Sequence, residues 1–304
     1  MKFLRLLVFL VLGSVLAAAS SSGIKKPFLW HVDKGEAEFY LFGTMHLADP
    51  SLLVLPEAVK KALRRSDAVY TEVSMEPADQ LKATGLMLRK DGETLQSTLP
   101  PSLYQRSREY LKSINPALKI QPFEKMKLWS FSATLQFLEA QLSHPALPTI
   151  DGMIYQKAKR EGKELGGIET VEEQLAAMEA LSDQEQLLMH EATLDFLEQN
   201  RDYVEIMQQL YLNGDEKKLM KYLTSMIFQE EKYRALEARF LQLILYERNR
   251  RMAERIIEKV RENPRKVYFF AFGTMHFLNS GSVIELLEKE GFYVERINSA
   301  KEKE

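Results

Sequence analysis

The sequence predicts an α/β (α+β) fold with a central mixed sheet, in which two similar strand-loop-helix-strand units meet and a large helical insertion separates them. Three observations support this prediction. The pentapeptide Phe-Gly-Thr-Met-His occurs twice, ending at His46 and at His276. Each copy closes an aromatic, apolar run that is typical of a buried strand. Each is followed by a helix-like stretch and a second apolar run. Because the copies lie 230 residues apart, a tandem solenoid is excluded.

The elements around each copy follow from turn and helix signals. A hairpin is expected around the turn Asp-Lys-Gly-Glu, and Pro56 opens the first helix. Trp30 and Phe28 are expected on a buried face. The expected strands and helices cover residues 26–31, 38–42, 56–67, 68–73, 266–273, 282–291 and 292–297.

The insertion, residues 76–262, reads as mainly helical. Thr170 and Ser182 each begin a capping box, and Asn213-Gly214 is a stop signal. The helix that starts at Ser182 is expected to run to about Asn213. The other expected helices cover residues 102–114, 124–142, 149–163 and 230–262, with one more after Asp215 and a short strand at 162–169.

Composition limits the class of protein. The chain has 304 residues, 45% of them hydrophobic, which suits a single domain over residues 24–298. It contains no cysteine, which excludes disulfides and thiolate metal sites, and its net charge of −2 offers no basic field for nucleic acid. Residues 299–304 form a charged tail.

The first 19 residues have the layout of a secretory signal peptide. Lys2 and Arg5 precede a short apolar run, which ends at three alanines. We expect cleavage near Ala19 and an exported protein, periplasmic or secreted, with no stable membrane span after cleavage. A retained membrane anchor is the alternative, although the apolar run is short for a bilayer.

His46 and His276 share one setting, the loop after a strand, where open α/β sheets bind ligands. Two imidazoles and a carboxylate suit a divalent metal, and Glu72, at the end of the next strand, is the best placed carboxylate. Glu72 would either bind the metal or act as a general base. Gly43 and Gly273 would allow the backbone to approach a ligand closely. The remaining histidines, His31, His144 and His190, are interpreted as ordinary core or surface residues.

Arg248 continues the apolar stripe of the last long helix, so it should point inward, where an arginine needs an anionic partner. There it could hold a substrate carboxylate or a developing oxyanion. Asp151 and Glu169 are further acidic candidates, for which an ordinary structural role is favoured. No P-loop, Gly-x-Ser-x-Gly, His-Glu-x-x-His or dinucleotide motif occurs.

Together, the two Gly-Thr-Met-His motifs, Gly-Ile-Glu-Thr-Val-Glu-Glu-Gln and Tyr-Glu-Arg-Asn-Arg-Arg-Met-Ala resemble the TraB/PrgY/GumN family, whose animal members include the Tiki proteins. The resemblance implies a fold similar to that of the erythromycin esterases and the activity of a divalent-metal-dependent protease. Its motif residues fall on Gly43, His46, Glu72, Gly273 and His276, and its Arg-Asn pair falls on Arg248 and Asn249.

The expected function is therefore a metal-dependent hydrolase, most simply a peptidase acting on a peptide or protein. The metal would be Mn, Co or Zn, held by His46, His276 and Glu72. Two alternatives stay open: a metal-free esterase that uses a His and a Glu, and a non-catalytic protein that sequesters a peptide signal.

Overall fold

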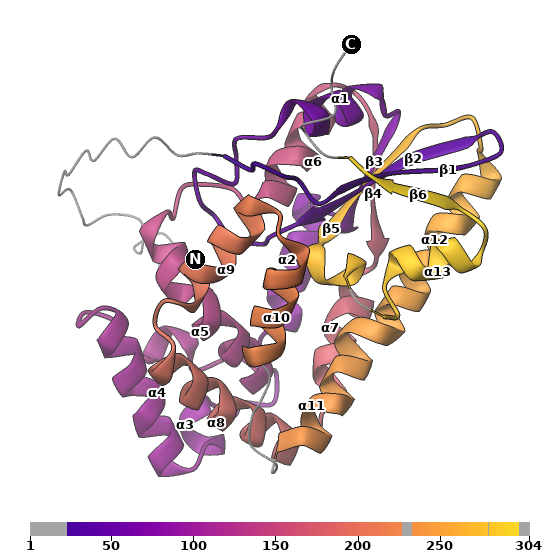
Figure 1. Cartoon of the computed structure of the whole chain (residues 1–304). Coiled ribbons are helices and arrows are strands. Elements are labelled where there is room, and N and C mark those ends of the chain that lie inside the picture. Colours follow the sequence, from indigo (N-terminus) through magenta and orange to yellow (C-terminus); the bar gives the residue numbers. More distant parts are fainter. Residues whose placement is uncertain (1–22, 227–232, 279, 298–304) are drawn as a thin grey trace.

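The computed structural model describes residues 23–226, 233–278 and 280–297, and these residues build a mixed α/β fold around one six-stranded sheet (Figure 1). The strand order is β4-β3-β5-β2-β1-β6. The predicted fold class is confirmed. The strands are β1 (Leu29–Lys34), β2 (Ala37–Thr44), β3 (Ala68–Val73), β4 (Glu164–Glu169), β5 (Tyr268–Gly273) and β6 (Tyr293–Arg296).

The two copies of the repeated motif lie side by side at the centre of the sheet. β2 and β5 are parallel, and β5 pairs on its other side with β3, which pairs with β4 in the same direction. The carboxyl ends of these four strands therefore meet at one edge. On the other side of β2, β1 runs antiparallel to both β2 and β6.

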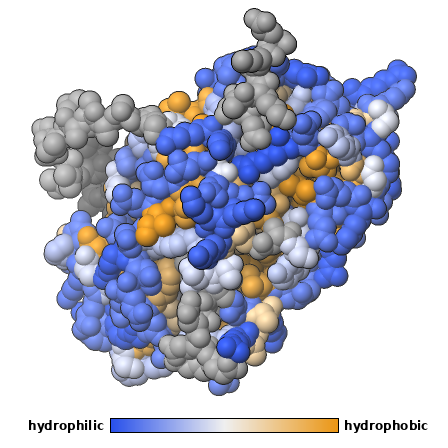
Figure 2. All heavy atoms as spheres, viewed as in Figure 1, coloured by the Kyte–Doolittle hydropathy of each residue, from blue (hydrophilic) through white to orange (hydrophobic). Residues whose placement is uncertain are grey.

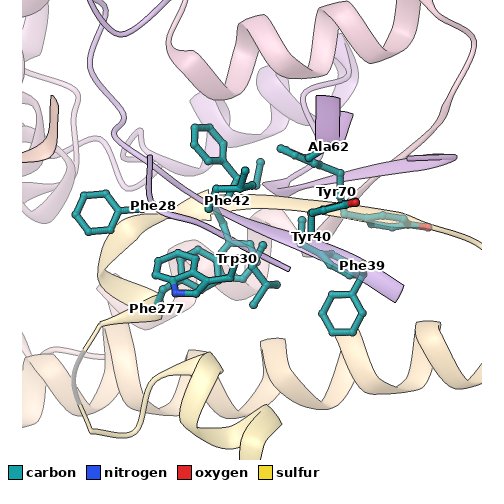
Figure 3. Packing of buried hydrophobic residues seen from close by; sticks show 14 of the residues in the cluster. Phe28, Trp30, Phe39, Tyr40, Phe42, Ala62, Tyr70 and Phe277 are labelled. Carbon is teal, nitrogen blue, oxygen red and sulfur yellow. The ribbon is translucent and has the colours of Figure 1, made fainter. Parts of the chain in front are cut away.

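Helices cover both faces of the sheet. On one face, α1 (Glu57–Arg65) and α6 (Ile150–Arg160) pack over β3 and its neighbours; on the other lie α12 (Glu247–Glu262) and α13 (Val283–Lys289) (Figure 1). Aromatic side chains fill both interfaces. Phe39 packs on Phe270 and Phe292, whereas Phe42 points to the opposite face and packs on Phe269 (Figure 3).

The insertion between β3 and β5 builds a second hydrophobic core of its own, apart from the sheet (Figure 1). Residues from α4, α5 and α8 dominate this core. β4 joins the sheet, while α6 and α12 and residues of α9 and α10 pack into the core around it. The helices of the insertion other than α6 are α2 (Pro77–Leu86), α3 (Leu95–Thr98), α4 (Pro101–Ile114), η1 (Gln121–Phe123), α5 (Leu128–Ser143), α7 (Val171–Glu179), α8 (Asp183–Gln199), α9 (Tyr203–Asn213), α10 (Glu216–Met226), α11 (Arg234–Leu241) and η3 (Gln242–Tyr246), with α12 closing it.

Two expected helices are interrupted. The one expected from Ser182 to Asn213 is broken at residues 200–202, where the Asn200 backbone leaves the helical region (φ −128°, ψ 67°). The one expected over 230–262 contains a π-helical turn, η3, between α11 and α12. The apolar stripe of the second helix continues across η3, so periodicity alone does not detect the π-turn, whereas residues 198–202, all of them polar, mark the break between α8 and α9.

The visible surface is mainly hydrophilic, with hydrophobic residues gathered in small patches (Figure 2). Within the described ranges, no helix is both long and apolar enough to cross a bilayer. Both the signal peptide expected at residues 1–19 and the tail at 299–304 lie outside the described residues, so cleavage and export stay predictions.

One buried histidine ties three helices of the insertion together. His190 of α8 is fully buried, with Ser107 Oγ of α4 2.9 Å from its Nε2 and Ser132 Oγ of α5 2.8 Å from its Nδ1. Burial, together with Arg106, lowers the pKa of His190 to about 4. The ring is therefore neutral in the folded protein at neutral pH.

We predict that His190 makes the protein less stable in weak acid. Between pH 6.5 and 5 an unfolded chain protonates this histidine and the folded chain does not, so the free energy of unfolding falls as pH falls. The slope is roughly 1.4 kcal/mol per pH unit for one histidine. In denaturant titrations over this window, His190→Gln should show a dependence on pH that is shallower by about that amount. Equal slopes in the two proteins would contradict the prediction.

Candidate functional site

The candidate site lies where the carboxyl ends of β2, β5, β3 and β4 meet. This edge holds Glu72 on β3 and Glu169 at the end of β4, while His46 and His276 follow β2 and β5. α12 adds Arg248 and Asn249 from one face of the sheet, and α6 adds Asp151 from the other. The structure thus brings together the residues that the sequence proposes for chemistry, Gly43 excepted.

The carboxylate of Glu72 is the centre of the site. It is buried, and four donors surround it. Its Oε2 accepts from the Gly273 backbone N–H at 3.2 Å and lies 3.2 Å from His46 Nε2. Its Oε1 accepts from Gln174 Nε2 at 2.6 Å and from Arg248 Nη2.

Arg248 points inward, with 6% of its surface exposed, and joins two acidic residues. Its Nη2 donates to Glu72, while its Nε donates to Glu169 Oε2 at 2.8 Å. Its remaining nitrogen, Nη1, donates to the Ile244 carbonyl at 3.2 Å, and Arg251 Nη2 donates to Glu169 Oε1 at 3.1 Å. Because every nitrogen of the guanidinium is bonded, Arg248 holds the two carboxylates in place. A role in binding substrate stays a prediction.

His46 bridges two carboxylates at the mouth of the site. Its Nδ1 lies 2.9 Å from Asp151 Oδ2 and its Nε2 faces Glu72, while 48% of its side chain is exposed. The Asp151 carboxylate outweighs the effect of burial and, with Glu72, holds the pKa of His46 well above its usual value. His46 is therefore protonated at neutral pH.

His276 has the opposite character although its motif is identical. It is buried, and its Nδ1 lies 2.6 Å from Asn249 Oδ1. The Asn249 amide is oriented by its own donation to the Gly281 carbonyl at 2.8 Å, so its oxygen faces the ring and Nδ1 carries the proton. Burial lowers the pKa of His276 to about 4, and its Nε2 lies 3.9 Å from Glu72 Oε1.

Glu72 stays ionised. Burial alone would raise the pKa of its carboxyl, but the charges of Arg248 and His46 and the hydrogen bond from His46 hold that pKa well below its usual range. A carboxylate with so low a pKa is a weak base. This environment favours an anionic ligand or anchor over a general base at Glu72.

The two motif glycines occupy different surroundings. A Cβ on Gly273 would lie 3.4 Å from Glu72 Oε2, 3.4 Å from His46 Nε2 and 3.6 Å from His276 Cδ2, so this glycine keeps free the point between the three side chains. A Cβ on Gly43 would instead meet Phe28 and Thr274, each at 3.0 Å. Gly43 serves close packing here, and its expected role in binding substrate stays a prediction.

The donor chemistry at this point fits a divalent metal. Two imidazole Nε2 atoms face one carboxylate, and each Nδ1 is bonded to a side-chain oxygen, the arrangement that fixes metal-binding histidines. The atoms are not in coordination geometry, since His46 contacts Glu72 directly. Over residues 23–226, 233–278 and 280–297, no group of three or more His, Asp or Glu side chains meets the spacing of a metal centre.

A groove adjoins the site on the side of His46. It encloses about 290 Å³ and includes the three residues that follow His46. Its far walls come from α5 and from the start of α9, so the helical insertion and the loop after His46 form this groove together. Its lining includes Leu47, Asp49, Gln136, Glu139, Tyr203 and Glu205.

Comparison with known proteins identifies the family of this chain. The sequence model of the TraB/PrgY/gumN family matches residues 28–296. The chain belongs to this family. Zebrafish (Danio rerio) metalloprotease TIKI2 is 28% identical over 88% of the chain, and human metalloprotease TIKI1 is 25% identical over 88%. An uncharacterized Escherichia coli protein, YbaP, is 26% identical over 83% of the chain and 89% of its own length.

The relationship to the TIKI proteins is partial. The chain spans about 60% of the length of the TIKI relatives that it matches, 60% for TIKI2 and 62% for TIKI1 of zebrafish. No solved structure matches it.

The sequence pattern does not reveal the roles of three side chains of the site. It favours a structural role for Asp151 and Glu169, and nothing in it distinguishes Gln174 from other polar residues of a helix. Asp151 and Gln174 lie near the start of α6 and α7, where polar residues are common in any helix. Only their shared position, each near the start of a helix that borders β4, could have indicated a link to the sheet edge.

We predict that Arg248→Lys destabilises the protein and the site together. Lysine keeps the charge but lacks the planar fork that joins Glu72 to Glu169, so one buried carboxylate loses its partner. The free energy of unfolding should fall by roughly 1–3 kcal/mol, measured by denaturant titration. The matched control is Arg250→Lys on the exposed face of the same helix, which should change little. Wild-type stability in Arg248→Lys would show that the fork is dispensable.

Proposed function

We propose that this protein is a divalent-metal-dependent hydrolase that cleaves peptide bonds, with His46, Glu72 and His276 as the residues that hold the metal. The observation that carries the proposal is the convergence of two Nε2 atoms on one carboxylate, with His46 Nε2 3.2 Å from Glu72 Oε2 and His276 Nε2 3.9 Å from Glu72 Oε1. The names of the TIKI relatives, which are called metalloproteases, support a peptide or protein substrate.

The residues of this chain prepare the site in two ways. Asn249 keeps the Nδ1 proton of His276, and therefore presents the Nε2 lone pair toward Glu72. Arg248 keeps the Glu72 carboxylate ionised, and Gln174 and the Gly273 N–H fix its orientation. Both effects leave electron-pair donors pointing at one place before any ligand arrives.

A bound metal would polarise the scissile carbonyl and lower the pKa of a water molecule. His46 Nε2 must lose its proton before it can donate to a metal, since its pKa is raised. The groove lined by the three residues after His46, between the loop after β2 and the helical insertion, is the path that we propose for a peptide.

We predict that a chelator abolishes hydrolysis and leaves the fold intact. A site with two histidines and no thiolate is held together by the sheet and by Arg248, so the protein should stay folded without the metal. The measurement is turnover of a peptide library after chelation and after return of Mn²⁺, Co²⁺ or Zn²⁺, with circular dichroism alongside.

Each of the other outcomes would indicate a different role for the protein or for the metal. Hydrolysis that persists in chelator would indicate a metal-free hydrolase that uses His46 and Glu72. Peptide binding without turnover under any metal would indicate a protein that sequesters its ligand. Unfolding on chelation would indicate a structural metal.

We predict that Glu72→Gln lowers metal content and turnover together. The amide keeps the shape but removes the charge that Arg248 and the metal both need. Metal stoichiometry and turnover are measured on the same preparation, with Glu76→Gln, on the segment after β3, as the matched control. Full metal with lost turnover would instead make Glu72 a general base. Full metal with wild-type turnover would remove Glu72 from the site.

A further inference from the structure

Asp151 is a buried carboxylate whose charged partner is a histidine and not an arginine or a lysine. Its surface is 1% exposed. Among the residues that the structure describes, no lysine or arginine lies within ion-pair distance of it, and His46 is the one group of opposite charge that it contacts. Burying a carboxylate costs several kcal/mol unless its oxygens are bonded. Glu72 and Glu169 have Arg248 for this purpose, whereas the two oxygens of Asp151 are bonded to Thr44 and His46.

Asp151 does not cap its own helix. It lies in the first turn of α6, where a carboxylate often bonds to free backbone N–H groups. Here the side chain of Thr149 accepts from the Gly152 N–H at 3.3 Å and fills that role. The two Asp151 oxygens instead point to the loop after β2, toward Thr44 and His46.

Thr44 determines which partner each oxygen of Asp151 has. Its hydroxyl donates to Asp151 Oδ1 at 2.6 Å, which leaves Oδ2 for His46 Nδ1. Thr44 belongs to the same Phe-Gly-Thr-Met-His motif as His46, so one short segment both carries the imidazole and orients the carboxylate that holds it. The orientation of the His46 ring depends strongly on the bond to Asp151, because the ring is half exposed and its other side-chain partner is Glu72.

We propose that Asp151 is a positioning residue that keeps the proton of His46 on Nδ1 and its ring in one orientation, so that Nε2 faces Glu72. It does for His46 what Asn249 does for His276. Without this bond the ring can turn about its Cβ–Cγ axis, and the proton can move to Nε2, the atom that must carry a lone pair for a metal. The metal part of this inference rests on the proposed function, whereas the position of the proton does not.

The test uses the full-length protein with ¹⁵N-labelled histidine, in Asp151→Ala, Asp151→Asn and wild-type forms. Long-range ¹H–¹⁵N spectra, recorded up to the pH at which His46 becomes neutral, report which ring nitrogen keeps the proton. We expect Nδ1–H in the wild type and a loss of that preference in Asp151→Ala. In Asp151→Asn the Thr44 hydroxyl should hold the amide oxygen, so the amide N–H₂ faces the ring and forces the proton onto Nε2.

Titration of the metal-free proteins with Mn²⁺ and Zn²⁺ gives a second readout. Loss of an outer-shell partner of a metal-binding histidine lowers metal affinity by about 10–100-fold, and we expect such a loss in both Asp151 variants. The matched control is Ser132→Ala, which removes a hydroxyl bonded to the buried His190 of the insertion. It should change stability without changing His46 spectra or metal affinity.

If the Asp151 variants do not fold, Thr44→Val serves in their place, since it removes the bond to Oδ1 and keeps the carboxylate. A mixture of the two proton positions at His46 is then expected. An unchanged Nδ1–H signal in every folded variant would overturn the inference. If the wild type binds no metal but the spectra change as expected, the proposed function fails and the positioning role stands.

Discussion

The structure of the site depends on the buried carboxylate of Glu72. Its four donors come from four segments that are far apart in the sequence: the loop after β2, the end of β5, α7 and α12. A buried carboxylate is tolerated only when its oxygens are bonded, so docking of these segments is a shared requirement. An incomplete sheet edge would leave an unpaired charge in the core. Assembly of the candidate site and folding of the sheet edge are therefore one process.

Charge pairing around this centre explains why two identical motifs behave differently. Three carboxylates, those of Glu72, Glu169 and Asp151, are buried at the edge. Arg248 contacts the first two, and His46 is the one charged group among the described residues that contacts the third. His46 thus carries a positive charge, whereas His276, which meets the neutral amide of Asn249, stays uncharged. The difference comes from the helices that dock on each histidine, not from the motif.

The sequence predicted those features for which a local pattern also determines where a residue lies in the fold. The repeated pentapeptide predicted adjacent strand ends, and the apolar stripe before Arg248 predicted its direction. The offset between the two copies was not predictable, because Gly43 pairs with Phe272, one residue away from Gly273. β2 therefore continues through Thr44, while the chain after Gly273 turns at once into a 3₁₀-helix. That offset, set by packing of the whole sheet, leaves His46 half exposed and His276 buried.

The π-helical turn before α12 reconciles two packing demands on one long helix. α11 belongs to the insertion, where Arg239 Nη1 donates to Glu185 of α8 at 2.8 Å, whereas α12 must turn Arg248 to Glu72 and, one residue later, Asn249 to His276. A continuous α-helix fixes the rotation of one end relative to the other. The wider turn at Gln242–Tyr246 changes that rotation, and the Ile244 carbonyl within it accepts from Arg248 Nη1. The helix can then satisfy the insertion and the site at once, and this accounts for a π-turn that ends two residues before Arg248.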